Sequence, residues 1–350
     1  QIYIQLKLKR EFIHFHLITQ KFLYKMLDKK TLRKIRLALK NNALVVEGAN
    51  GSMSLSLLKI LIENEIKVPR LLLTTKSSIP DKLWNKVSNK IELIHASNNS
   101  FLNKRNKIIT SFTKSFNVFY GAGYGRPNLF LNDPKSVISA NIKNLIEYSN
   151  YKNLNLFAYC STSEIYSGSK GSVNEDSSIV SSTQQPRSVY IETKRLGEAI
   201  TANIISKVAK RAVSYRIALA ISPKIIPADN RVLADLIHSG RTKRCVVLNG
   251  GSNLVRQYQY GPNSIYKILG SLVNGDATLY NNAGSHIITL GNLAKLVAKI
   301  LKVKCKIQNQ NVDNTSPKKV LINSDLIDAH SKYQIKKEKN LETYLRLILC

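Results

Sequence analysis

The sequence predicts an α/β protein built on a parallel sheet that helices cover on both faces. Short, continuous apolar runs recur between residues 43 and 220, and stretches with helical patterning separate them. Continuous apolar runs are typical of strands buried on both faces, and helices between them form the crossovers of a parallel sheet. Beyond Pro223 the alternation weakens, which indicates a smaller region of mixed α/β structure.

The chain begins with a basic segment, residues 1–40. Lys and Arg far outnumber Asp and Glu there, and residues 11–40 are patterned as one or two amphipathic helices. A basic amphipathic helix can lie on a membrane surface, but we expect this helical extension to dock on the body of the protein.

The part that follows is predicted to alternate strands and helices. We expect a doubly wound sheet over residues 41–222 and a second, smaller region over residues 223–350. The apolar runs predict strands at 43–48, 70–75, 91–96, 117–123, 153–161 and 212–220. Helices are expected at 52–64, 134–150, 187–209, 229–242 and 291–302.

Composition narrows the class of protein. The 350 residues are 43% hydrophobic, which suits a globular protein with a large core. No apolar run is long enough to span a membrane, and no secretory signal stands out. A zinc site or disulfide framework is not expected, and a cytoplasmic location fits best, because the cysteines form no CxxC pair. They are Cys160, Cys245, Cys305 and Cys350.

The formal net charge of +31 is the most unusual global feature. A positive field attracts nucleotides, nucleic acids and acidic membranes alike. The excess is spread along the whole chain, and no compact basic motif with interleaved aromatic residues is present. We therefore expect solvated lysines and no nucleic-acid partner.

Two glycines directly after the first predicted strand indicate a phosphate-binding turn. In "VVEGANGSMSLSLL", Gly48 and Gly51 precede a helix, whose N-terminus favours the negative charge of a pyrophosphate. This arrangement predicts a Rossmann-type dinucleotide-binding sheet. Ser54 occupies the usual third glycine position and is small enough for close packing. Glu47 has to point away from a bound pyrophosphate.

The second predicted strand ends without the acidic residue that usually holds the adenosine ribose. Thr74, Thr75 and Lys76 stand there instead, so NAD and NADP are both left open. The cofactor contacts expected from the turn and this strand are Gly48, Asn50, Gly51, Ser54 and Thr75.

A tyrosine and a lysine lie four residues apart in "SVYIETKR", which is patterned as helix. Tyr190 and Lys194 therefore project from the same helix face. A nearby ammonium favours the phenolate, which would make Tyr190 a proton acceptor near neutral pH. The simpler interpretation is a tyrosine that packs on a lysine stem. Upstream, "YCSTSEIYSG" ends an apolar run, so Thr162, Ser163 and Glu164 are expected at the ligand-facing edge of the sheet.

These motifs, taken in order, resemble the NAD-dependent epimerase/dehydratase family, the extended short-chain dehydrogenases/reductases that act on nucleotide sugars. The resemblance runs over residues 41–345 through "VVEGANG", "DPKSVISANIKNLIEYS", "STSEIYSG", "PRSVYIETKR", "VRQYQY" and "NNAGSHIITLGNLAKLVAKIL". Within the family, "TSE" followed by "PRSVYIETKR" looks most like UDP-glucuronate decarboxylases of surface-polysaccharide pathways.

The resemblance implies NAD as cofactor and a role for each matching residue. Tyr190 would take the proton of the sugar 4-hydroxyl, and Lys194 would lower its pKa and hold the nicotinamide ribose. Thr162 would bond the same hydroxyl, while Ser163 and Glu164 would orient the sugar or transfer a later proton.

The resemblance also assigns residues around this centre. Asn141 would contact the cofactor region and position the active-site strand. Arg231 and Arg256 would pair with the substrate diphosphate. Arg187 would contact a sugar carboxylate or form a salt bridge, and Tyr260 is a further expected substrate contact.

The implied reaction oxidises the sugar at C4, releases carbon dioxide from the 4-keto uronate, and reduces the product again. A 4,6-dehydratase and a 4-epimerase remain alternatives. A further alternative is a weakened binding or scaffold protein, because several positions depart from the family pattern: Glu47, Ser54, Ser97, Leu219 and Asn263. The resemblance further implies nucleotide-sugar binding by residues 223–350 and a homodimer formed through the tyrosine–lysine helix.

Overall fold

The computed structural model describes residues 27–76, 82–97, 100–123, 125–223, 231–308, 317–333 and 339–349. The basic helices expected before residue 27 lie outside these residues. Within them, helix α2 (Lys29–Lys40) begins at the cap Asp28, whose side chain accepts a hydrogen bond from the Thr31 amide. Its apolar face packs on the core through Ile35 and Leu39, as docking on the body of the protein requires.

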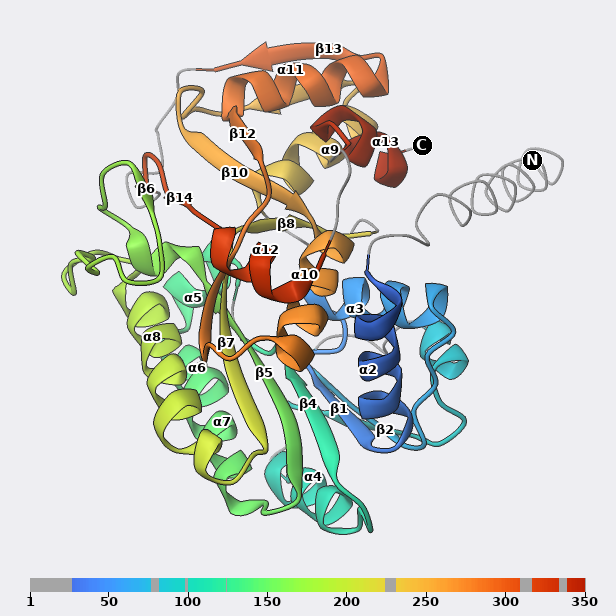
Figure 1. The fold of residues 1–350 in the computed structure, drawn as a ribbon. Coiled ribbons are helices and arrows are strands. Elements are labelled where there is room, and N and C mark those ends of the chain that lie inside the picture. The colour runs from blue at the N-terminus through green and yellow to red at the C-terminus, as the bar shows by residue number, and fades with distance from the viewer. Residues whose placement is uncertain are drawn as a thin grey trace, which may run out of the picture.

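A seven-stranded, wholly parallel sheet forms the centre of the molecule (Figure 1). The predicted fold class is therefore confirmed. From one edge to the other the strands are β11 (Leu279–Asn282), β7 (Arg211–Ile217), β5 (Leu154–Thr162), β4 (Phe116–Tyr120), β1 (Ala43–Glu47), β2 (Leu71–Thr75) and β3 (Ile91–His95).

Helices cover both faces of this sheet because its strands are apolar on both sides. In β1, Leu44 and Val46 contribute to one core cluster, while Ala43 and Val45 contribute to the opposite one. The first face carries α2, α3 (Ser52–Glu63), α10 (Gly261–Asn274) and α12 (Asp325–Ser331). The second face carries α4 (Phe101–Thr110), α7 (Asn144–Ile146) and α8 (Ser188–Asn203).

The helix expected at residues 134–150 is interrupted. It consists of α6 (Pro134–Ile138), a π-helical turn (Ser139–Lys143), α7 and a 3₁₀ turn (Glu147–Asn150), and α5 (Pro127–Asn132) precedes it. A π-turn inserts an extra residue and re-aims the side chains that follow. Here it buries Asn141 beside α8.

The run expected as one strand at residues 212–220 also divides. Residues up to Ile217 form β7 in the large sheet, and after Ala218 the chain forms β8 (Leu219–Ile221) in a second sheet. That sheet has the order β12 (His286–Thr289), β10 (Val255–Tyr260), β8, with one antiparallel and one parallel pairing. The C-terminal region is therefore mixed, as expected.

The second region has its own apolar core between helices and short strands. Helices α9 (Val232–Thr242), α11 (Leu290–Leu301) and α13 (Leu341–Leu349) surround the pair β9 (Cys245–Leu248) and β13 (Lys304–Ile307). A further pair joins β6 (Ser172–Val173) to β14 (Leu321–Ile322). The short 3₁₀ helices elsewhere are Lys82–Lys86, Ser163–Tyr166 and Ile205–Lys207.

Three elements beyond residue 223 belong spatially to the large sheet. Helices α10 and α12 pack on its first face, and strand β11 extends its edge beside β7. The chain thus crosses between the two regions more than once, and the functional division at residue 222 remains a proposal. Among the described residues, no helix is long and apolar enough to cross a membrane.

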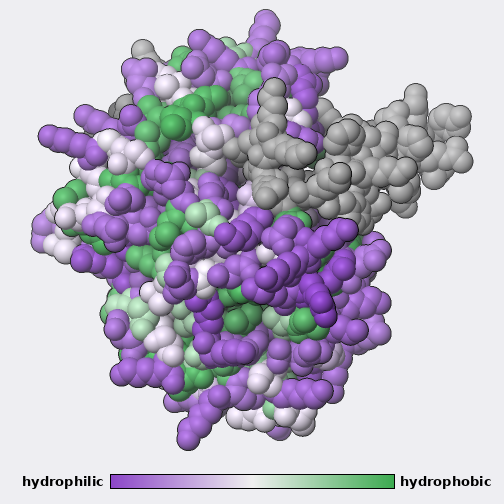
Figure 2. All heavy atoms as spheres, viewed as in Figure 1, coloured by the Kyte–Doolittle hydropathy of each residue, from purple (hydrophilic) through white to green (hydrophobic). Residues whose placement is uncertain are grey.

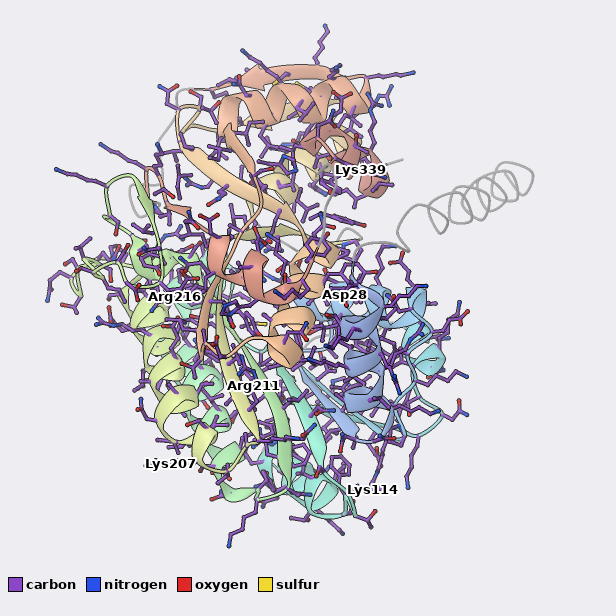
Figure 3. The ribbon with its side chains drawn as sticks, in the orientation of Figure 1. Asp28, Lys114, Lys207, Arg211, Arg216 and Lys339 are labelled. Carbon is purple, nitrogen blue, oxygen red and sulfur yellow. The ribbon has the colours of Figure 1, made fainter. Side chains whose placement is uncertain are left out.

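Charge is distributed over the molecular surface. Figure 2 shows hydrophilic residues over most of the visible face, with apolar residues in small separate groups. In Figure 3, charged side chains extend outward around the whole molecule: Lys114 and Lys207 lie near one end, and Lys339 belongs to the opposite region.

Candidate active site

A cleft lies at the carboxyl ends of the central strands, between the large sheet and the second region. Carboxyl ends of parallel strands are the usual ligand-facing edge of such sheets. The cleft brings together all five of the expected catalytic residues. Its lining includes Ser52, Gly121, Ala122, Gly123, Thr162, Ser163, Glu164, Tyr190, Lys194, Arg231, Arg256 and Gln257.

The turn after β1 is built for close approach of a ligand. Gly48 has a φ of +75°, and a Cβ there would lie 3.0 Å from the Ala122 backbone. Gly51 then caps α3 without a side chain, leaving the backbone amides of its first turn directed at the opening. This cradle fits an anionic phosphate group, as the sequence predicts.

Ser54 supports this turn from below. It is fully buried, and a Cβ added to Gly121 would lie 3.0 Å from the Ser54 Oγ. Serine in place of glycine is accommodated because residue 121 has no side chain. The expected cofactor contact of Ser54 is therefore corrected to a packing role beneath the turn.

Glu47 points away from the turn, toward α4. Its carboxylate accepts a hydrogen bond from the Tyr148 hydroxyl at 2.5 Å and pairs with Arg105 Nη1 at 3.0 Å. The Thr74 hydroxyl donates to its second oxygen. The Arg105 and Glu47 side chains are only 0% and 2% exposed, so the ion pair is buried. The carboxylate is thus neutralised inside the protein and does not face the phosphate cradle.

Sequence reasoning missed the partners of this carboxylate. Arg105 also donates to the carbonyl of Asn144 and lies over the ring of Tyr148. Burial alone would lower the pKa of Arg105, but Tyr148 and Glu47 outweigh it and raise that pKa. A carboxylate at the end of a buried strand signals that a cationic partner exists. It does not signal which of the many cations is the partner.

Tyr190 projects from α8 into the cleft beside Thr162. Its ring stacks on Phe130 with centroids 4.5 Å apart, and the Thr162 side chain lies close enough to act on the pKa of Tyr190. Burial and the nearby Glu164 carboxylate raise the pKa of Tyr190. The Thr162 hydrogen bond and the charges of Arg231 and Arg187 oppose that rise without cancelling it.

Lys194 lies one helical turn further along and is also buried. Its Nζ donates to the Cys160 carbonyl at 2.9 Å and to the Ala122 carbonyl at 3.4 Å. Burial lowers the pKa of Lys194 to about 8. The expectation that Lys194 makes Tyr190 more acidic is not met, because burial dominates the pKa of both groups.

Asn141 supports the helix that carries both residues. Its Nδ2 donates to the Thr193 hydroxyl at 3.0 Å, so it positions α8 and not the strand β5 that the sequence suggested. Its Oδ1 is buried without a hydrogen-bond partner. A Cβ added to Gly123 would lie 2.7 Å from this oxygen and 2.8 Å from Lys194 Nζ. Glycine at position 123 therefore keeps the space before Asn141 and Lys194 open.

The expected arginines lie in different settings. Arg187 Nη1 pairs with Glu164 at 3.1 Å, and the two side chains are 4% and 25% exposed. Arg231 lines the cleft close enough to Tyr190 to act on its pKa, so it lies beside the reacting centre. Arg256 also lines the cleft, and its Nη1 donates to the carbonyls of Val255 and Pro317.

Tyr260 is not a substrate contact in this structure. It is buried in the core of the second region, where its ring stacks on Tyr344 at 4.7 Å. The prediction failed because Tyr258 and Tyr260 share one strand face, and both are buried in that core.

A second buried ion pair connects α8 with β5 and β7. Glu198, one turn after Lys194, accepts bonds from the Ser161 hydroxyl at 2.5 Å and from Arg216 Nη2 at 2.8 Å. Arg216 also bonds the Tyr166 hydroxyl. The network holds α8 against the strand that ends at Thr162. In the sequence, the feature that indicates this network is an acidic residue four positions after Lys194.

Comparison with protein families shows where the chain belongs. Residues 44–263 match the NAD dependent epimerase/dehydratase family. The chain belongs to this family, and it is an NAD-dependent enzyme. No curated protein matches the chain.

Solved structures of this family share the fold with low sequence identity. An epimerase of Methanothermobacter thermautotrophicus has a TM-score of 0.74 and 15% identity, covering 92% of this chain and 94% of its own. UDP-glucuronic acid 4-epimerase of Bacillus cereus, in complex with UDP-glucuronic acid and NAD, has a TM-score of 0.69 and 16% identity, with coverages of 88% and 98%. The UDP-N-acetylglucosamine 4-epimerase of Methanobrevibacter ruminantium has a TM-score of 0.70 and 15% identity, with coverages of 89% and 98%.

The residues of the cleft fit NAD. The cradle at Gly48 and Gly51 suits a pyrophosphate, and a buried ammonium and an unpartnered amide oxygen face the space before Gly123. Lys194 and Asn141 would offer a donor and an acceptor to the ribose hydroxyls of such a cofactor. Among the described residues, no group of His, Cys, Asp and Glu could hold a metal ion.

Proposed function

We propose that this enzyme oxidises C4 of a UDP-sugar and that its substrate is UDP-glucuronate, which it decarboxylates. The observation that carries the proposal is that Thr162, Tyr190 and Glu164 line the same cleft as the first turn of α3, with Arg187 paired to Glu164. Bound NAD would supply the acceptor for the C4 hydride and return it at the end of the cycle.

Proton transfer in the first step is assigned to Tyr190. The Thr162 hydroxyl orients the sugar 4-hydroxyl, and the proton passes to the Tyr190 oxygen as C4 becomes a carbonyl. The raised pKa keeps this phenol protonated near neutral pH. Positive charge must therefore act on Tyr190 for it to accept a proton, and Arg231 and Arg187 are cations whose charges already oppose the rise of its pKa.

Decarboxylation then follows from the chemistry of a β-keto acid. The C5–C6 bond breaks, carbon dioxide leaves, and the electron pair forms an enolate that Thr162 and Tyr190 stabilise as hydrogen-bond donors. A proton is returned to C5, and reduction of the C4 carbonyl gives UDP-xylose with no net redox change. Arg187, held by Glu164, is the cation proposed to face the sugar carboxylate.

A second candidate outcome is elimination or epimerisation at the same 4-keto sugar. The partly exposed Glu164 carboxylate lies near Tyr190, which would suit an acid or base for loss of water across C5–C6. Solved relatives in fold include a 5,6-dehydratase of tunicamycin biosynthesis with 12% identity. A role in polysaccharide biosynthesis and a cytoplasmic location are part of the main proposal.

We also infer that the enzyme is a homodimer formed through α6, α7 and α8. These neighbouring helices expose the apolar side chains of Ile138, Ile146 and Leu196. Leu196 is 50% exposed on the helix that carries Tyr190 and Lys194. An apolar face on packed helices is typical of a surface that a second subunit covers.

The test is product analysis with a panel of nucleotide sugars. Wild-type protein supplied with NAD should convert UDP-glucuronate to UDP-xylose and carbon dioxide, as followed by NMR. Tyr190→Phe should lower the rate at least about 100-fold, because it removes the proton acceptor. Tyr151→Phe, which removes a hydroxyl from the other end of the sheet, should retain the rate.

If the product is a 4-keto-6-deoxy sugar or a C4 epimer, the reaction is elimination or epimerisation and not decarboxylation. If the protein converts none of UDP-glucuronate, UDP-glucose, dTDP-glucose and GDP-mannose, the scaffold interpretation replaces the proposed activity.

A further inference from the structure

The ring of Tyr190 lies against a second aromatic ring, that of Phe130 on α5. The two ring centroids are 4.5 Å apart, and the ring planes differ by only 7°. A separation of this size is typical of stacked aromatic pairs. The phenol oxygen lies in the plane of its own ring, so a neighbour that fixes this plane also restricts the direction in which the oxygen points into the cleft.

Helix α5 directs Phe130 toward Tyr190. Asp133 directly follows this short helix and caps the first turn of α6, which fixes the end of α5. Leu129 and Leu131, the neighbours of Phe130, are 38% and 36% exposed, whereas Phe130 is 3% exposed. Phe130 is therefore directed into the apolar cluster that also contains Tyr190.

Arg187 lies over the same ring. Its Cζ is 5.4 Å from the ring centroid of Phe130, which is within the range of a cation–π contact. Its Nη1 also donates to both carboxylate oxygens of Glu164, at 3.1 and 3.2 Å. Burial is the main cause of the raised pKa of Tyr190; the charge of Glu164 adds to this rise, and the charge of Arg187 opposes it. Phe130 thus contacts both the phenol and a cation that favours its ionised form.

These contacts need a flat ring and not merely an apolar side chain. Leucine or methionine at position 130 could fill much of the same space. Neither offers a face on which a phenol can stack or an electron-rich surface that attracts a guanidinium. Without the ring, Tyr190 and Arg187 would lose the surface that both contact. Proton transfer depends on such positions, because a displacement of about 1 Å can cost about 100-fold in rate.

We propose that Phe130 is a positioning residue of the oxidation step, whose ring holds the Tyr190 phenol and the Arg187 guanidinium in one fixed arrangement. The inference rests on the proposed role of Tyr190 as proton acceptor and adds a residue that sets its geometry. Phe130 does not belong to the described residues that line the cleft, so its loss should slow the step and leave NAD binding intact.

Rapid mixing of the NAD-loaded protein with saturating UDP-glucuronate measures the step. Phe130→Leu should slow nicotinamide reduction at least about tenfold. Its NAD affinity, measured by calorimetry, should change less than about threefold. Phe130→Met takes the place of Phe130→Leu if the latter does not fold. Phe130→Tyr keeps the ring and should retain the rate within about threefold.

Phe116→Leu is the matched control. Phe116 is fully buried at the amino end of β4, where its ring contacts Phe112 and Tyr151. This variant should lower the melting temperature, as Phe130→Leu should, because both remove a buried ring. It should not slow nicotinamide reduction, because the lost ring lies far from the cleft.

Two further readouts separate positioning from general packing. The pH at which the step reaches half its maximal rate should be higher in Phe130→Leu, because a displaced Arg187 opposes the rise of the Tyr190 pKa less well. In protein labelled with 3-fluorotyrosine and free of cofactor and substrate, the signal of Tyr190 is identified by its loss in Tyr190→Phe. This signal should shift in Phe130→Leu, which removes the stacked ring. Phe116→Leu should change neither the pH profile nor this signal.

The failures are distinguishable. A wild-type protein that never reduces the nicotinamide would overturn the proposed function and this inference together, because no oxidation step would remain. Reduction as fast in Phe130→Leu as in wild type would overturn this inference and leave the proposed function intact. Equal slowing by Phe116→Leu or by Phe130→Tyr would do the same, because the effect would then not belong to the ring of Phe130. An unchanged pH profile or an unmoved Tyr190 signal in Phe130→Leu would contradict the proposed arrangement.

Discussion

The charge of Lys194 depends on whether the protein is folded. Lys194 is buried against two backbone carbonyls, and its pKa is lowered from 10.5 to about 8. Between these two values the unfolded chain binds a proton that the folded chain has lost. The contribution of Lys194 to stability therefore rises with pH across this window, with a slope of at most about 1.4 kcal/mol per pH unit.

This pH dependence separates wild type from a variant without the amine. The free energy of unfolding, measured by urea denaturation at several pH values from about 8 to 10.5, should rise more steeply for wild type than for Lys194→Met. NAD binding should weaken as the pH rises through about 8, because the folded protein then loses the Lys194 ammonium that is proposed to contact the ribose. Identical pH profiles for the two proteins would show that Lys194 is not buried as described.

Arg105 is predicted to be the most sensitive charged residue for stability. Arg105→Met leaves the Glu47 carboxylate buried without its cation, which should lower the free energy of unfolding by about 3–5 kcal/mol. Arg70→Met is the control, because its pair with Glu92 is about one-fifth exposed. That variant should cost about 1 kcal/mol or less. Equal losses would contradict the inference that the Glu47–Arg105 pair is buried and tightly held.

At the scale of elements, six of the seven central strands could be predicted, whereas β11, most strands of the second region and several helices could not. Strand β1 is buried at all five positions, and such a strand produces an apolar run that is plain in the sequence. Helix α4 was missed because it buries only Phe101, Arg105 and Ile109, and one of these is a charged residue. The π-turn at Asn141 was missed because the inserted residue leaves helical patterning almost unchanged.

Part of the candidate site could likewise be predicted from the sequence, and part could not. Tyr190, Thr162 and Lys194 were identified because their spacing and their place at a strand end are local features. The cofactor contact of Ser54 and the element that Asn141 positions were misassigned because they depend on contacts with Gly121 and Thr193, which are distant in sequence. Pairings of this kind follow from the packing of elements and have no local signal.

The phosphate turn depends on the packing of α3 against the end of β4. A methyl group at position 121 would lie 3.0 Å from Ser54 Oγ and 3.3 Å from the Glu47 carbonyl. Gly121→Ala should therefore displace the turn and weaken NAD binding at least about tenfold, as measured by calorimetry. Adding Ser54→Gly should recover part of the affinity, because it removes the shortest of three close contacts, the third being Phe119 Cε1 at 3.3 Å. Unchanged affinity in Gly121→Ala would contradict the described packing.

At the scale of the whole molecule, the proposed dimer connects assembly to the active site. Leu196→Glu places a charge on the exposed face of α8 and should shift the protein from dimer to monomer in light scattering coupled to size-exclusion chromatography. Lys207→Glu is a control for the change of charge, since Lys207 is an exposed residue beyond the end of α8. A wild-type protein that is already monomeric would exclude this interface.

Contacts between distant elements explain why most departures from the family pattern are compatible with an intact site. Glu47 is neutralised by Arg105, Ser54 is accommodated by Gly121, and Asn263 bonds the Tyr344 hydroxyl at 2.8 Å in the core of the second region. Each substitution has a compensating partner in another element. The cleft that holds Tyr190, Thr162 and Lys194 is retained.

The account depends on these three side chains acting as one oxidation site. The most direct measurement is the absorbance of reduced nicotinamide after rapid mixing of the NAD-loaded protein with UDP-glucuronate. We predict a transient rise for wild type and none for Tyr190→Phe, with NAD bound to both proteins. A wild-type protein that binds NAD and the sugar nucleotide but never reduces the nicotinamide would contradict the central claim.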